Sequence, residues 1–427
     1  MKKSQIEIKE LYACSPVVIW RYVKGQSFGF WCVCIYLFFE YVRPQSVYTS
    51  LDVFPWAAMF IILSFAFAIF EKEKVVGNAT SKLIGCYGVI VLLSASFAKW
   101  PELSFSSLGD YWLWVLVFFN IVRLINTKER FYIFLLLYLL CNYKMSQHGF
   151  IAWALRGFSF TNWGVTGAPG WFKNSGEFGI QLTIFIPLAI AFSMALKQYW
   201  GKWTRYFFYL MPITGIGSVV ATSSRGAMLG MVISGLWQVK SSKYLIRAIL
   251  AFAIMASLIY AVTPDELKSR FTSSGEDKTS MHRLHRWEAG WNTALSNPVF
   301  GVGHKNWDSY FRTYLDHGQK GSAKIHNIFM ESLTEHGFTG VIVLILLLLS
   351  MLRLNALTRK MHKDNSDKFN VYIAYGLDAG LIGMIVSSSF VTVLYYPYVW
   401  VHAAFVVALY NVTYKTQQSD PLRLIVK

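Results

Sequence analysis

The sequence is poor in charged residues: only 15% of its 427 residues are Asp, Glu, Lys or Arg. Soluble domains carry about 25%, so this shortage argues against a chain that is surrounded by water. Hydrophobic residues make up 55% of the chain. Long runs such as 60–70 and 341–350 carry no charge, and many stretches of the chain come near the roughly 20 mostly apolar residues that cross a membrane as a helix. The runs lack the strict alternation of barrel strands, so we expect membrane-spanning helices.

Cysteine is also scarce, with five residues in the chain. None lies between 263 and 325, the longest polar segment, so we expect no disulfides and no cysteine metal site there. Three motifs are missing as well: the D-x-D carboxylate pair for a metal-bound nucleotide sugar, the G-x-x-x-x-G-K loop for ATP and the H-E-x-x-H zinc site. We therefore expect neither a metal nor a cofactor. No small-residue cleavage site follows the first apolar run, which predicts an uncleaved N-terminus.

The hydropathy pattern predicts an all-α polytopic membrane protein with about twelve transmembrane helices. A large loop, 263–325, is expected to be helical and to lie outside the membrane, and a second loop is expected near 143–176. The chain is thus divided into the spans of 1–262, the large loop, and the spans of 326–427. The expected spans are 27–42, 53–70, 83–98, 108–122, 131–147, 177–196, 206–222, 226–239, 248–262, 335–352, 371–391 and 397–413.

The formal net charge of +17 is explained by basic loops on the cytoplasmic side of a membrane, and we expect no nucleic-acid partner. If the N-terminus is inside, most of the 40 lysines and arginines fall on inner segments. This pattern predicts that both termini are cytoplasmic. The two longer loops then lie on the outer, periplasmic face of a bacterial inner membrane.

The large loop carries arginines on helices. Thr263 and Pro264 begin a short helix that includes Arg270, with a cap and a first-turn proline. Ser280 begins a second helix, on which Arg283 and Arg286 share a face with a glycine. Guanidinium groups bind phosphate oxygens in a bidentate way, so this face is a candidate phosphate site. A solvated basic face is the alternative interpretation.

Two further residues are candidates for chemistry. Arg225 lies between two expected spans at the outer face, flanked by serine and glycine, and it either binds an anion or extends to the interface as a snorkelling side chain. His326 begins a helix on which Asn327, Glu331 and Glu335 form one stripe. A histidine there either accepts a proton near neutral pH or only makes hydrogen bonds at the helix start.

Three pieces of the sequence together resemble the O-antigen ligase and O-antigen polymerase superfamily of bacterial membrane glycosyltransferases. They are Ser224 to Ala227, Arg283 to Gly303, and His326 to Gly340. The resemblance implies a metal-independent, inverting transferase. The donor would be a glycan on undecaprenyl pyrophosphate. The acceptor would be a hydroxyl of lipid A-core or protein for a ligase, or a second lipid-linked repeat for a polymerase.

The resemblance also implies roles for single residues. Arg225 and Arg283 would hold the pyrophosphate, with Arg270 and Arg286 as further candidates, and His326 would activate the acceptor hydroxyl. Lys173 and Asn174, which precede the sixth expected span, are candidate donor contacts. These seven positions form the expected site.

Two other classes of function are open from the sequence alone. A transporter or lipid-glycan flippase would need polar groups inside the spans, and Asn120, Gln181 and Asp378 are the main ones. A non-catalytic scaffold for polysaccharide assembly would not depend on the arginines or the histidine. Between ligase and polymerase we favour a ligase, because one outer loop is dominant.

Overall fold

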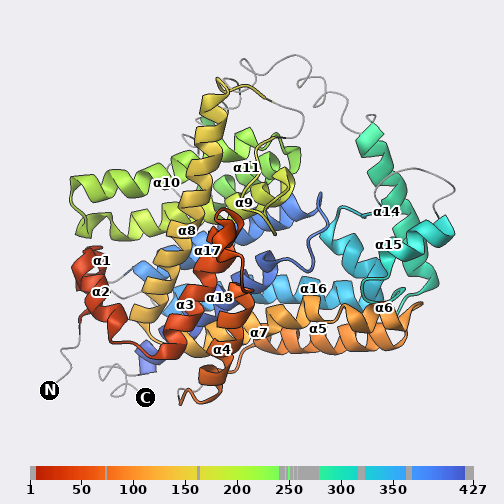
Figure 1. The fold of residues 1–427 in the computed structure, drawn as a ribbon, viewed down its shortest axis with the longest axis horizontal. Helices are drawn as coiled ribbons and strands as arrows, with labels where there is room; N and C mark the ends of the chain where they lie inside the picture. Colours follow the sequence, from red (N-terminus) through yellow and green to blue (C-terminus); the bar gives the residue numbers. More distant parts are fainter. Residues whose placement is uncertain are drawn as a thin grey trace.

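The computed structural model describes residues 6–72, 75–160, 164–239, 278–315, 323–361 and 368–418, with a few positions between 246 and 257. Every regular element in these residues is a helix (Figure 1). The helices are α1 (Ile8–Tyr12), α2 (Pro16–Lys24), α3 (Phe28–Tyr41), α4 (Trp56–Ile69), α5 (Ala79–Ser96), α6 (Pro101–Ser106), α7 (Gly109–Leu124), α8 (Lys128–Leu155), α9 (Ser175–Leu196), α10 (Lys202–Ala221), α11 (Arg225–Val239), α14 (Lys278–Ser296), α15 (Trp307–Tyr310), α16 (Ile328–Met361), α17 (Phe369–Ser388) and α18 (Pro397–Gln418). Short helical turns are η1 (Pro44–Ser46), η2 (Thr49–Leu51), η3 (Lys197–Tyr199) and η4 (Phe311–Leu315).

Several of these helices can cross a membrane. Six stretches of the described residues are long and apolar enough: Thr49–Ile69, Ala79–Ser96, Pro101–Leu124, Ser175–Tyr199, Ile328–Met361 and Phe369–Ser388. The expectation of a helical, polytopic membrane protein is therefore confirmed. Each expected span coincides with a helix except 248–262, which lies outside the described residues. The total of about twelve spans stays a prediction, because α3 and α11 have only 14 and 15 residues.

Helix α9 lies at the centre of the bundle. Within its apolar window 83% of residues are buried, against 17% for the window that contains α4, which leaves α4 at the periphery. Small residues let α17 approach α9 closely: a Cβ at Gly376 would lie 2.7 Å from the Cβ of Ala191. Close packing at small residues is how membrane helices associate.

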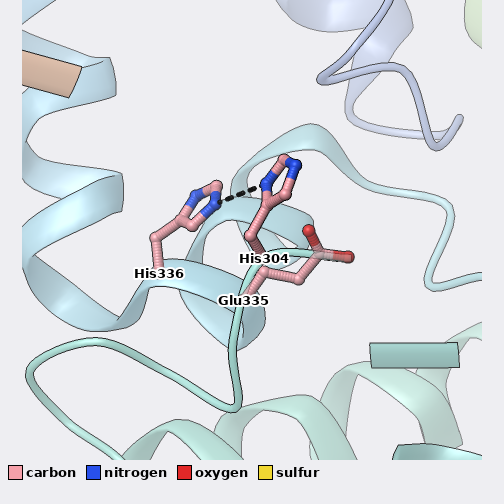
Figure 2. Close-up of side chains that lie close together, drawn as sticks. All are labelled: His304, Glu335 and His336. Carbon is pink, nitrogen blue, oxygen red and sulfur yellow. Dashed lines mark hydrogen bonds between the residues drawn. The ribbon is translucent and has the colours of Figure 1, made fainter. Parts of the chain in front are cut away.

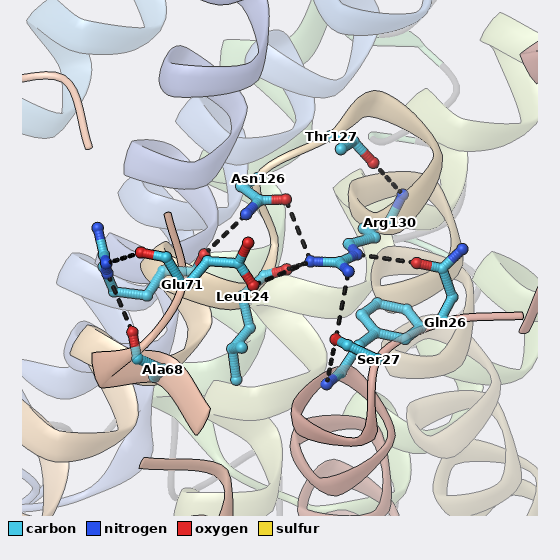
Figure 3. Close-up of polar contacts among 10 residues, drawn as sticks. Gln26, Ser27, Ala68, Glu71, Leu124, Asn126, Thr127 and Arg130 are labelled. Carbon is cyan, nitrogen blue, oxygen red and sulfur yellow. Dashed lines mark hydrogen bonds and ion pairs between the residues drawn. The ribbon is translucent and has the colours of Figure 1, made fainter. Parts of the chain in front are cut away.

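A polar cluster joins the starts of α3 and α8 and the end of α7 (Figure 3). The guanidinium of Arg130 donates to Gln26 Oε1 at 3.0 Å, to Ser27 Oγ at 3.2 Å and to the carbonyl oxygen of Leu124 at 3.0 Å. It also lies 3.6 Å from a carboxylate oxygen of Glu71. These partners explain why one of the arginines expected on the inner side is partly buried.

Helices α14 and α15 lie at one end of the long axis of the molecule, and α1 and α2 lie at the other end (Figure 1). The link between α5 and α6 packs at the same end as α14. There the N–H of Lys99 donates to the carbonyl of Val302 at 2.9 Å, and the N–H of Trp100 donates to Asn306 Oδ1 at 2.8 Å. Two segments that were both expected on the outer face thus adjoin each other. Which side of the membrane they face stays a prediction.

Candidate functional site

Residues 389–396, the connection between α17 and α18, link the separate parts of the expected site. Phe390 fills the space beside Gly226, where a Cβ would lie 2.9 Å from its ring. Thr392 Oγ1 accepts the backbone N–H of His326 at 2.8 Å. The Tyr396 hydroxyl donates to Glu177 Oε1 at 2.8 Å. One short segment therefore contacts the starts of α9 and α11 and the segment before α16.

His326 has the geometry of a residue held in place for a purpose other than packing. Its φ of 53° is left-handed, a conformation uncommon outside glycine. The side chain is half-buried, and among the described residues its imidazole forms no hydrogen bond. Burial, together with the smaller effect of the positive charges of Arg283, Arg286 and Lys324, lowers the pKa of His326 to about 4. The imidazole is therefore neutral at pH 7 and can accept a proton.

Helix α14 brings its arginines to His326. The helix begins at Lys278, two residues before the expected start at Ser280, and ends at Ser296. Trp287 donates its indole N–H to the carbonyl of Ile325 at 2.8 Å. Gly290 lies against the same segment, since a Cβ there would be 2.8 Å from Ile325. Arg283 and Arg286 share the face of Gly290, and their charges act on His326.

Arg225 is the first residue of α11. The turn before it is tight: Ser223 has a φ of 53°, and Ser224 Oγ accepts the N–H of Ala227 at 3.4 Å. Phe390 packs on Gly226, two residues before the threonine that holds His326. The structure therefore brings Arg225 and His326 to neighbouring positions of the 389–396 connection. Arg270 lies outside the described residues.

Asn174 has a structural role that the sequence analysis did not assign. Its Oδ1 accepts the N–H of Gly176 at 2.8 Å, and its backbone N–H donates to Glu177 Oε2 at 3.2 Å. This is a capping box at the start of α9. Lys173 is exposed beside it, and both Lys173 and Lys324 act electrostatically on Glu177. Contacts of Lys173 or Asn174 with a donor stay a prediction.

Helix α16 is broken at Gly337, where φ is 70° and ψ is −168°. The break frees backbone carbonyls, and the loop after α14 satisfies them: the N–H of Val302 donates to Thr334 at 2.8 Å, and that of Gly303 donates to Glu335 at 3.2 Å. In return the N–H of Phe338 donates to Pro298 at 2.8 Å. Residues 301–304 thus form a clasp around the break in α16.

In the stripe of Asn327, Glu331 and Glu335, the two glutamates are buried and Asn327 is half-buried. Asn327 caps α16, since its Oδ1 accepts the N–H of Phe329 at 2.9 Å and that of Met330 at 3.1 Å. The two carboxylates are only 4% and 5% exposed. Glu331 accepts the N–H of Leu394 at 3.0 Å, and Glu335 accepts the hydroxyl of Tyr395. They fasten the 389–396 connection to α16.

A buried cluster of His304, Glu335 and His336 is the feature that the sequence analysis missed (Figure 2). Burial lowers the pKa of His304 to about 4, so it is neutral at pH 7. Lys305 lies beside the cluster: burial acts to lower its pKa, but the carboxylates of Glu335, Glu331 and Asp110 outweigh this and raise it. The signal that could have revealed the cluster is Glu335-His336, two ionisable residues next to an apolar run.

Two comparisons with known proteins bear on the site. Residues 210–345, which include Arg225, α14, the clasp and His326, match the family model described as O-Antigen ligase. The chain is also 25% identical over 224 residues to "Exopolysaccharide production protein ExoQ" from Rhizobium meliloti (strain 1021). That match covers 48% of this chain and 49% of the relative, so it spans about half of each protein. Together these matches confirm the resemblance seen in the sequence: residues 210–345 are similar to the O-antigen ligase family, and about half of the chain is similar to the exopolysaccharide protein.

Proposed function

We propose that this protein transfers a glycan from undecaprenyl pyrophosphate to an acceptor hydroxyl at the periplasmic face of the bacterial inner membrane. The main support is that α14 packs against Ile325, beside His326. The charges of Arg283 and Arg286 on this helix therefore act on the imidazole of His326. A neutral base beside two guanidinium groups suits a reaction in which a hydroxyl attacks and a diphosphate leaves. The similarity to the O-antigen ligase family supports the same chemistry.

The reaction needs one bond to form and one to break. The acceptor oxygen attacks the anomeric carbon and gives its proton to His326, a step that general-base catalysis accelerates by about 10²–10⁴-fold. The bond from that carbon to the phosphate oxygen breaks, and the electron pair leaves with the lipid pyrophosphate. Arg283, Arg286 and Arg225 stabilise the charge where it develops. Direct attack inverts the anomeric centre, and no enzyme-bound sugar is required.

A second candidate differs only in the acceptor. If the acceptor is another lipid-linked repeat, the protein is a polymerase, and the similarity to a protein named for exopolysaccharide production favours this alternative. We retain the ligase as the first candidate, with lipid A-core or protein as the acceptor. Surface polysaccharide from a deletion strain separates the two, because loss of all attached glycan indicates a ligase and a single attached repeat indicates a polymerase.

The polar residues inside the spans give little support to a transporter. Asn120 donates to the carbonyl of Ile61 at 2.8 Å, and Gln181 donates to Tyr138 at 2.6 Å. Asp378 accepts from Arg359 at 2.6 Å. These bonds join neighbouring helices, as expected of polar residues that stabilise a bundle.

The proposal is tested with purified full-length protein in proteoliposomes that contain a lipid-linked glycan and an acceptor. His326→Ala and Arg283→Ala should each reduce transfer at least about 100-fold, while the variants still insert in the membrane. His148→Ala, an exposed histidine on α8, serves as the matched control and should leave transfer unchanged. Full transfer in both site variants would refute the mechanism and favour a scaffold. In cells, lipid-linked glycan that accumulates on the inner leaflet of a deletion strain would instead indicate a flippase.

A further inference from the structure

The buried cluster has the donor atoms of a metal site. His304 comes from the clasp, and Glu335 and His336 come from the last turn of α16 before its break. Their ligand atoms all lie within 4.8 Å of one another. Figure 2 shows the imidazoles of His304 and His336 facing each other, with the carboxylate of Glu335 beside His304. Both histidines are 0% exposed, and Glu335 is 5% exposed. Two imidazoles and a carboxylate form a donor set that suits zinc and related divalent ions.

In each imidazole, the ring nitrogen that faces away from the other histidine has a hydrogen-bond partner, as it does in histidines that bind a metal. His304 Nε2 lies 3.1 Å from the carbonyl oxygen of Ser107. A carbonyl can only accept, so this nitrogen carries the hydrogen and Nδ1 keeps its lone pair. His336 Nδ1 lies 3.0 Å from the Tyr87 hydroxyl. When one ring nitrogen of a histidine binds a metal, the other nitrogen is usually hydrogen-bonded in this way.

The two inward-facing nitrogens have the spacing of tetrahedral ligands. His304 Nδ1 and His336 Nε2 are 3.4 Å apart. An ion with bonds of about 2.0–2.1 Å at the tetrahedral angle separates two nitrogens by about 3.3–3.4 Å. The same distance is long for a hydrogen bond, which is the other way for these nitrogens to interact. The Tyr395 hydroxyl is 3.3 Å from His336 Nε2 and bonds to Glu335, so it can be a fourth ligand.

The charges around the cluster also favour a cation. Glu331 and Glu335 are both buried, and both act on Lys305. That lysine is paired with Asp110 as well, at 3.1 Å, and its ammonium lies 4.1 Å from the centre of the Tyr395 ring. One ammonium thus faces three carboxylates. Buried carboxylates are paired, protonated or bound to metals, and binding to a divalent ion would give Glu335 such a partner.

We propose that His304, Glu335 and His336, with Tyr395, bind one divalent transition-metal ion of the zinc type. The ion would join the clasp, the break in α16 and the 389–396 connection, and the connection holds the backbone of His326 through Thr392. Its role would be structural, because the ligands are buried and His326 is not among them. The inference therefore does not depend on the proposed transfer reaction, and it replaces the expectation of a metal-free protein without changing the chemistry assigned to His326.

The test is metal binding by the full-length protein, purified in detergent with an affinity tag that lacks histidines. The protein is stripped with a chelator, loaded with Zn²⁺, passed through a desalting column and analysed for bound zinc. We expect one equivalent in the native protein and in His402→Gln, which alters a buried histidine outside the cluster. His304→Gln and His336→Gln should retain less than a tenth of this amount. Equal retention by all four proteins, or none by the native protein, would overturn the proposal.

A second measurement needs no variant, so a folding defect cannot obscure the result. Co²⁺ is added to the stripped native protein, and its X-ray absorption spectrum is recorded. Two imidazole ligands in a four-coordinate site support the assignment. A six-coordinate spectrum without imidazole shows that the ion binds elsewhere, and then the pair of histidines is a hydrogen bond only. In the first case Zn²⁺ should also raise the melting temperature of the native protein.

Discussion

At the scale of single residues, the environment of His326 decides what it can do. Most histidines change charge near pH 6.5, and a base that is already protonated at pH 7 would be ineffective. Burial and the charges of Arg283, Arg286 and Lys324 together lower the pKa of His326 to about 4. The arginines that we assign to the diphosphate therefore also keep the base in its reactive form.

This environment predicts the pH dependence of transfer. His326 is active when neutral, so the rate at low donor concentration, which reports the free enzyme, should be constant from about pH 6 to 8 and fall as the pH approaches 4. Arg283→Gln removes one positive charge, raises the pKa of His326 and moves this acidic decline to higher pH. Rates are measured in proteoliposomes from pH 4 to 8. Arg353→Gln, at an exposed position farther along α16, is the control, and an identical shift there would contradict the assignment.

At the scale of elements, glycines and caps fix where helices begin, bend and end. The first turn of α9 depends on the capping box of Asn174 and Glu177. The break in α16 depends on Gly337, whose φ of 70° is strained for any other residue. Both elements border the expected site, so a change in either one is transmitted to it.

Gly337→Ala should destabilise the protein strongly. An added Cβ would lie 2.5 Å from the carbonyl oxygen of Pro298, and the left-handed φ adds a cost of about 1–3 kcal/mol. We expect the melting temperature in detergent to fall by several degrees. Gly85→Ala is the matched control: it lies on the exposed face of α5 with nothing within 4 Å of the new Cβ, so it should be neutral or slightly stabilising. Equal stability of the two variants would disprove the role of the break.

Substitutions of Asn174 separate a helix cap from a donor contact. Asn174→Ala removes the cap oxygen and should cost about 1 kcal/mol of stability. Asn174→Ser keeps a capping oxygen, so it should restore both stability and transfer. Thermal unfolding and the proteoliposome assay are run on the same preparations. If the serine variant is as stable as the native protein but inactive, the amide contacts the donor, and capping alone does not explain the residue.

At the scale of the whole molecule, the distribution of charge predicts the orientation in the membrane. Basic residues gather at the segments expected inside, and α14 and α15 lie at the far end of the molecule from α1 and α2 (Figure 1). If α11 runs inward from Arg225, the chain must cross the membrane again before α14. This crossing is the expected span at 248–262.

Reporter fusions test this topology. Alkaline phosphatase is active only outside the cytoplasm, so a fusion after Asn297 should be active and a fusion after Lys427 inactive. Green fluorescent protein at the same two positions should give the opposite pattern. Activity of the phosphatase after Lys427, or its absence after Asn297, would reverse the assigned orientation and move the proposed site to the cytoplasmic face.

The sequence by itself determined the helical membrane class, the positions of most helices and the resemblance to the O-antigen ligase superfamily. These properties follow from runs of apolar residues and from local motifs, which do not depend on how the helices pack. His326 and the arginines of α14 were also identified in this way. Only the tertiary structure placed them together, because Arg283 and His326 are far apart in the chain and meet through packing of α14 on the start of α16. It also revealed the cluster of His304 and His336. These two residues are 32 positions apart in the chain, and they face each other because the backbone of residues 302 and 303 bonds to Thr334 and Glu335 at the break in α16.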